Sequence, residues 1–65
     1  MRAKKVKIKT LMLGWHEVSR EQALRIARRL FDGMVRMTDA EKVEFLNERV
    51  QGTQFTLEKL KAVRV

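Results

Sequence analysis

Residues 19–37, SREQALRIARRLFDGMVRM, form the longest segment of the chain in which apolar residues recur with the period of a helix. Ser19 is a suitable N-cap, because its hydroxyl can accept a hydrogen bond from a free backbone amide of the first turn. The apolar stripe, which covers about half of the helix circumference, contains Ala23, Ala27, Leu30, Met34 and Met37. Gly33 interrupts the segment, but the apolar spacing continues beyond it. The pattern predicts a helix over about residues 20–36 whose apolar side forms the centre of the core.

Residues 5–9, KVKIK, alternate strictly between basic and apolar side chains, which is typical of a half-buried β-strand. The alternation places the two apolar residues on one face and the lysines on the other. Residues 11–13 break this pattern, and a strand that continued through them would be covered on both faces. Gly14 and Trp15 can form a tight reversal, after which the chain pairs back on the strand. We therefore expect an N-terminal strand or β-hairpin over about residues 5–18, with Trp15 as a lid on the core.

A second N-cap begins the motif T-D-A-E, in which Thr38 and Glu41 can form a capping box. The acidic residues of this motif suit the positive end of a helix dipole. Gly52 is a fitting residue to end the segment. The motif predicts a second helix over about residues 39–51.

Thr56 is a third N-cap and predicts a short helix over about residues 57–63. Residues 53–55 have extended character and could add an edge to the N-terminal strand. The chain has no proline, no repeat and no segment of linker composition. The expected fold is small and α+β, with the N-terminal strand or hairpin packed on three helices in a single compact domain over residues 1–65.

The composition excludes several kinds of site. There is no cysteine, which excludes disulfides and thiolate metal ligands and is compatible with a cytoplasmic location. His16, the one histidine, has no companion at the spacing of a metal site. No apolar run is long enough for a membrane span or a signal peptide, and the three glycines form no phosphate-binding loop. We expect a cytoplasmic protein that is not an enzyme and that has no cofactor, no metal and no membrane association.

The net charge is +7, from fifteen Lys and Arg against eight Asp and Glu. Residues 1–18, 19–37 and 53–65 are basic, whereas residues 38–52 are acidic. A balance of this kind favours polyanionic partners such as nucleic acid. High charge can also simply maintain the solubility of a small domain.

Basic residues of the expected strand and first helix are the candidate contacts for a nucleic-acid backbone. They are Lys5, Lys7, Lys9, Arg25, Arg28, Arg29 and Arg36. Purely structural roles compete with this hypothesis. Lysines on an edge strand protect against aggregation, and arginines four residues from Glu21 or Asp32 can form salt bridges on a solvated helix face. The first hypothesis is a small basic nucleic-acid-binding module or accessory factor, in which the lysines and arginines act together if they are adjacent.

Phe45 fits its helix worst, because it lies away from the apolar stripe of residues 39–51. Acidic residues surround it, including Glu41 and Glu48. Another part of the chain could cover Phe45, or it could mark a contact with a second copy or with a protein partner. The alternative hypothesis is therefore a protein-interaction or self-associating module that uses this helix and has no nucleic-acid role.

Overall fold

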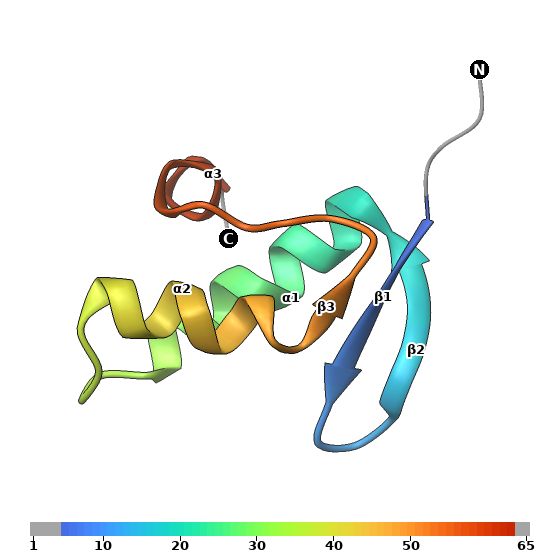
Figure 1. The fold of residues 1–65 in the computed structure, drawn as a ribbon, viewed down its shortest axis with the longest axis horizontal. Helices are drawn as coiled ribbons and strands as arrows, with labels where there is room; N and C mark the ends of the chain where they lie inside the picture. The colour runs from blue at the N-terminus through green and yellow to red at the C-terminus, as the bar shows by residue number, and fades with distance from the viewer. Residues whose placement is uncertain (1–4, 64–65) are drawn as a thin grey trace.

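The computed structural model describes residues 5–63 and has an α+β fold (Figure 1). The elements in chain order are β1 (Lys5–Thr10), β2 (Gly14–Ser19), α1 (Arg20–Gly33), α2 (Asp39–Asn47), β3 (Val50–Gln51) and α3 (Leu57–Ala62). The strands form one antiparallel sheet in the order β2-β1-β3, and the three helices lie to one side of it (Figure 1). The predicted combination of an N-terminal hairpin and three helices is confirmed, whereas the third strand and its place in the sheet differ from the prediction.

The hairpin matches its predicted bounds to within one residue but turns at a different place. β1 and β2 pair from Lys5 and Ser19 to Thr10 and Gly14, so the chain reverses through residues 11–13 and not at Gly14. The Leu13 N–H donates to Thr10 Oγ1 at 3.2 Å, and Gly14 has a φ of +64°, in the left-handed region that glycine tolerates. A three-residue loop followed by such a glycine is a common hairpin connection.

The predicted helix over residues 39–51 is wrong in its last turn, because α2 ends at Asn47 and residues 50–51 form β3. Val50 pairs with Ile8 of β1 and is only 8% exposed. The Lys9 N–H donates to the Arg49 carbonyl at 2.9 Å, which continues the contact between the two segments. A β-branched residue fits a buried sheet position well, so pairing with β1 replaces the helical turn. β1 is consequently the central strand and not an edge strand.

Gly52 does not cap a helix but lets the chain pass close to β1. Its φ is +103°, and a Cβ at this position would lie 3.3 Å from Val6 Cγ1. Beyond it, the Asn47 side chain holds the connection to α3 through two hydrogen bonds with Phe55. Asn47 Oδ1 accepts from the Phe55 N–H at 2.7 Å, and Nδ2 donates to the Phe55 carbonyl at 3.0 Å. Residues 53–55 therefore stay outside the sheet.

The start of α1 is confirmed: Ser19 is the N-cap, and its Oγ accepts from the Gln22 N–H at 3.1 Å. The predicted extension to residue 36 is wrong, since α1 ends at Gly33. Glycine is a poor helix former, and the Met34 N–H closes the last turn on the Phe31 carbonyl at 3.2 Å. Met34 then packs against the core from a non-helical backbone. The apolar spacing beyond Gly33 therefore reflects contact of Met34 with the core and not a continuation of the helix.

The core lies between the sheet and the three helices. Its buried residues are Val6, Ile8, Ala23, Ala27, Phe31, Leu46, Val50, Phe55 and Leu60. α1 supplies three of them, and two of these, Ala23 and Ala27, belong to the predicted apolar stripe. Leu30 and Met34 of the same stripe pack against the core while remaining partly exposed. α3 matches the prediction to within one residue, with Thr56 as N-cap and Leu60 fully buried.

Candidate nucleic-acid interface

Three lysines project in a row from the face of the sheet that α1 does not cover. Along β1 the lysines alternate with the buried Val6 and Ile8, so the two sets lie on opposite faces of the strand. This outer face of the sheet consists of Lys5, Lys7, Lys9, Trp15, Glu17 and Gln51, all of which are exposed. Because β3 and Arg49 pair with β1 from Lys7 to Lys9, protection of a sheet edge does not account for Lys7 and Lys9. The outer face therefore offers a short line of cations to an anionic ligand.

The register of the hairpin decides which residues of β2 join the lysines. Trp15 pairs with Lys9, and Glu17 pairs with Lys7. Glu17 lowers the net positive charge at the middle of the row, whereas Trp15 places an indole beside the lysine nearest the turn. Trp15 is 44% exposed, so the prediction that it is a lid on the core is wrong. His16 and Val18 take the inner positions instead, since they pair with Ile8 and Val6.

Arg28 is part of the fold and is not a free surface cation. Its Nη1 donates to the Leu60 carbonyl of α3 at 2.8 Å, and its Nε lies 3.1 Å from Asp32 Oδ1. The side chain is 22% exposed. Arg28 thus joins α1 to the last turn of α3, where a cation suits the negative end of the helix dipole.

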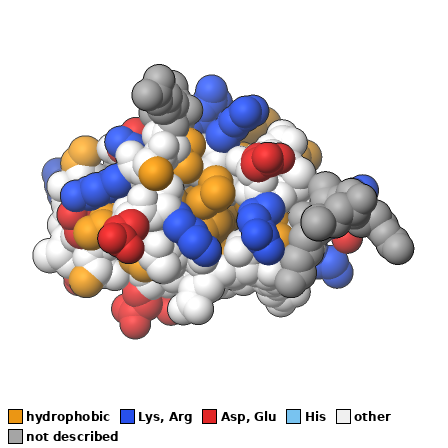
Figure 2. All heavy atoms as spheres, turned by 90° about the horizontal axis from the view of Figure 1, so that it is seen from above, with side chains coloured by type: hydrophobic (Ala, Val, Ile, Leu, Met, Phe, Trp, Pro, Cys, Tyr) orange, Lys and Arg blue, Asp and Glu red, His pale blue; other side chains and the backbone are white. Residues whose placement is uncertain are grey.

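The other three arginines are exposed but do not form one row with the lysines. Arg25 and Arg29 lie on α1, and Arg36 follows the end of that helix. Since α1 packs on the inner face of the sheet, Lys5 and Lys7 lie on the side of the sheet opposite the helix that carries Arg25 and Arg29. Lys9, at the end of β1, also lines a pocket with Leu30 of α1. Figure 2 shows that, on the face it presents, Lys and Arg side chains are separated by acidic and hydrophobic ones. The predicted candidates therefore divide into separate basic groups.

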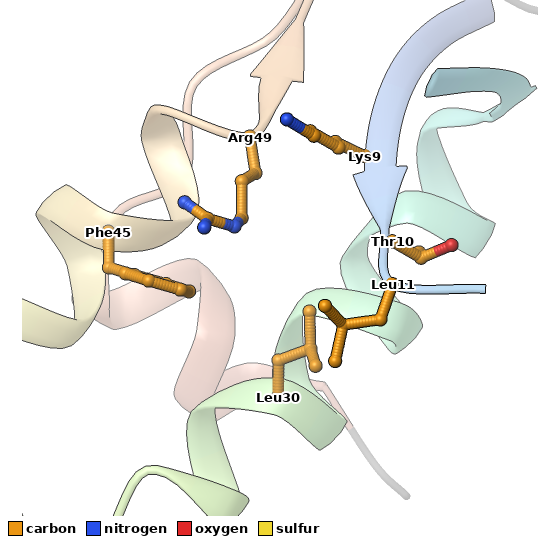
Figure 3. Close-up of a pocket in the computed structure, with 6 residues that line it drawn as sticks. All are labelled: Lys9, Thr10, Leu11, Leu30, Phe45 and Arg49. Carbon is orange, nitrogen blue, oxygen red and sulfur yellow. The ribbon is translucent and has the colours of Figure 1, made fainter. Parts of the chain in front are cut away.

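A pocket of about 270 Å³ opens beside the end of β1 (Figure 3). It is lined by Lys9, Thr10, Leu11, Leu30, Phe45 and Arg49. The Arg49 guanidinium carbon lies 3.8 Å from the centre of the Phe45 ring, a distance that allows a cation–π contact. Phe45 is thus half-buried, between the core on one side and Arg49 on the other.

Sequence reasoning missed Arg49, because it placed this residue inside a helix, whereas it lies in the turn directly before β3. In the structure the Arg49 backbone is hydrogen-bonded to Lys9, which brings a fourth cation beside the three lysines of the row. Sequence reasoning also did not foresee that residues 11–13 are exposed at the end of the hairpin. The available signal was the loss of alternation directly before Gly14.

The acidic helix has a structural role at its first turn. Glu41 Oε1 accepts from the Thr38 N–H at 2.9 Å, and Thr38 Oγ1 accepts from the Glu41 N–H at 3.3 Å, which confirms the capping box. Hydrogen bonds from the Thr38 backbone and hydroxyl hold the pKa of Glu41 below its usual value. Asp39 lies 3.8 Å from both Lys42 and Lys61. Glu48, at the other end of α2, is exposed.

His16 is half-buried, and its Nδ1 lies 3.2 Å from the Gly14 carbonyl oxygen. Within residues 5–63, no three potential ligands are grouped so that they could hold a metal ion. In the same part of the chain, none of the helices has both the length and the apolar character needed to cross a membrane. Comparisons of the chain with protein-family models, with curated proteins and with solved structures found no match.

Proposed function

We propose that the chain is a small nucleic-acid-binding module that contacts the phosphate backbone through the outer face of its sheet. The observation that carries the proposal is the row of Lys5, Lys7 and Lys9, exposed on the central strand with Trp15 beside it. Successive outward positions on a strand are about 6.6 Å apart, which is close to the distance between neighbouring phosphates in an extended single strand. Exposed aromatic rings provide stacking surfaces for unpaired bases.

The basic residues have different roles here from those predicted from the sequence. The lysines of β1 make the main contacts, with Arg49 beside Lys9. Arg28 is excluded from direct binding, because α3 and Asp32 already occupy its guanidinium. Arg25, Arg29 and Arg36 add to the overall positive field, which speeds the encounter with a polyanion without fixing its position.

The test is a fluorescence titration of the full chain with a single-stranded oligonucleotide and with a duplex over a range of salt concentrations. Three lysine contacts predict a log–log salt slope of about −2 for the single strand and about −3 for the duplex. In the double variant Lys7→Gln/Lys9→Gln, two contacts are lost, so the slope for the duplex should approach about −1.

The matched control is Arg25→Gln/Arg29→Gln, which removes the same charge from α1. Because the net charge of the two double variants is equal, any difference between them reports the position of the contact. The control should retain the slope of the unmodified chain and most of its affinity. Equal losses in both variants would contradict a site on the sheet, and no binding at about 50 mM salt would contradict the proposed function itself.

A second candidate function is self-association or protein binding through α2, with Phe45, Glu41 and Glu48 as contacts. It is supported by the pocket beside Phe45, whose apolar lining from Leu11 and Leu30 could accept a side chain of a partner. Light scattering over a wide range of protein concentrations tests self-association. A species that remains monomeric at the highest concentration would remove this candidate as a homo-oligomer.

A further inference from the structure

Three consecutive apolar residues are exposed at the end of the β1–β2 hairpin. Leu11, Met12 and Leu13, which we call the hairpin tip, are 104%, 94% and 69% exposed. The tip has a defined backbone, because Leu13 donates to the Thr10 hydroxyl and Gly14 adopts a left-handed conformation. Runs of this kind are rare on soluble domains without a function, since each exposed aliphatic side chain is unfavourable in water.

Cations and the single tryptophan surround the base of the hairpin tip. Lys9 and Trp15 face each other one residue pair behind the turn. Arg49 lies at the same level, where its carbonyl accepts from the Lys9 N–H and its guanidinium contacts Phe45. Figure 3 shows Lys9 and Arg49 with Leu11 around the same pocket, and none of the residues that line this pocket is acidic.

The order of these groups along the hairpin matches the layers of a bilayer surface. Aliphatic side chains come first, an indole and two cations follow, and Lys7 lies further up the strand. Aliphatic residues favour the hydrocarbon, tryptophan favours the interface, and lysine and arginine favour anionic headgroups. We propose that the hairpin tip inserts into the surface of membranes that contain anionic lipids, with Lys9 and Arg49 at the level of the headgroups.

Charge and shape favour a lipid surface as the partner of the hairpin tip over a second copy of the chain or a nucleic acid. A second copy docked tip to tip would bring Lys9 and Arg49 of both chains together, and like charges repel. In nucleic acid, bases stack on planar side chains, whereas the tip has none. The inference does not rest on the proposed function, and it departs from the sequence-based expectation of no membrane association.

Trp15 provides a direct readout, because it is the only tryptophan in the chain. The full chain is titrated with vesicles of phosphatidylcholine alone and of phosphatidylcholine mixed with phosphatidylglycerol. Co-sedimentation and the emission of Trp15 are followed together. We expect binding to the anionic vesicles, a shift of the emission to shorter wavelength, and at least about tenfold weaker binding to the neutral ones.

The variant Met12→Ser/Leu13→Ser removes two exposed apolar side chains and should weaken vesicle binding by about tenfold or more. The matched control is Val35→Ser, because Val35 is 80% exposed but lies in the connection between α1 and α2. It should bind as the unmodified chain does. Thermal melts verify that each variant folds. If the double variant does not fold, the single variant Met12→Ser replaces it in the vesicle titration.

Four results would overturn the inference. They are no binding to anionic vesicles, binding that the tip variants leave unchanged, tip-dependent oligomers formed without vesicles, and tip-dependent binding of an oligonucleotide without vesicle binding. The last two would assign the hairpin tip to a second copy or to nucleic acid. If the unmodified chain bound anionic vesicles but no oligonucleotide, only the proposed nucleic-acid function would be contradicted.

Discussion

The contact between α1 and α3 and the open end of the hairpin contain similar residue types in opposite situations. At the helix contact, Leu60 is fully buried and Arg28 donates to its carbonyl. At the hairpin end, Leu13 is 69% exposed, and Lys9 projects from the outer face of the sheet. The first region uses its apolar and basic groups to hold the fold, whereas the second leaves them available for a ligand. Exposure and hydrogen bonding, and not residue type, separate stabilising residues from candidate binding residues.

The largest expected contrast is between two leucines. Leu60→Ala removes a fully buried side chain and should lower the free energy of unfolding by about 2–5 kcal/mol, enough to unfold much of so small a domain. Leu13→Ala should change it by less than about 0.5 kcal/mol, because Leu13 already faces solvent. Urea unfolding measures both. A large loss of stability in Leu13→Ala would show that the hairpin tip packs against the chain.

The next contrast is between two arginines of the same helix. Arg28→Gln leaves the Leu60 carbonyl without its charged donor and should lower the free energy of unfolding by about 1–3 kcal/mol. Arg25→Gln, at an exposed position, should cost less than about 0.5 kcal/mol. Urea unfolding again provides the comparison. Equal effects would contradict the structural role of Arg28.

Two glycines should respond to alanine with opposite signs. Gly14→Ala places a side chain at a φ of +64° and should destabilise the chain by about 1–2 kcal/mol. At Gly33 a Cβ would meet no atom within 4 Å and the φ is not left-handed, so Gly33→Ala should stabilise the chain by about 0.4–1 kcal/mol. Thermal unfolding of both variants tests the difference. Stabilisation by Gly14→Ala would mean that the hairpin turns in another way.

The smallest effect concerns Glu41, an exposed charge that nevertheless serves the fold. Its pKa is lowered by hydrogen bonds from Thr38, so the contribution of the capping box is present above the usual carboxyl pKa and is lost as the pH falls through the lowered value. NMR titration should show a pKa below the usual value. Thr38→Ala removes the hydroxyl but keeps the backbone N–H, which makes the larger contribution, so the pKa should rise only part of the way toward the usual value. An unchanged pKa would show that the Thr38 hydroxyl does not contribute.

The starts of the helices could be predicted from the sequence, whereas their ends could not. Ser19, Thr38 and Thr56 all cap helices as expected, because capping is a contact between residues close in sequence. The end of α2 depends on pairing between β3 and β1, which lie far apart in the chain. No local pattern distinguished Val50 in a helix from Val50 in a short strand.

In the candidate site, too, the features set by neighbouring residues could be predicted from the sequence, whereas the contacts between distant elements could not. Alternation in β1 placed the lysines on one face, but the side on which Trp15 lies depends on the hairpin register. The role of Arg28 depends on where α3 packs, and the exposure of the hairpin tip depends on which residues form the turn. Each of these facts requires the three-dimensional arrangement.

The pairing of β3 with β1 also has a kinetic consequence. The β1–β2 hairpin closes a short loop and can form within about 1–10 μs, but β3 can add to β1 only when the C-terminal half of the chain has docked. Until then, one edge of β1 is open to strands of other chains, which is a route to aggregation. The Lys9 amide, hydrogen-bonded to Arg49, should therefore exchange its hydrogen whenever this half detaches, and its exchange rate reports how often that edge opens.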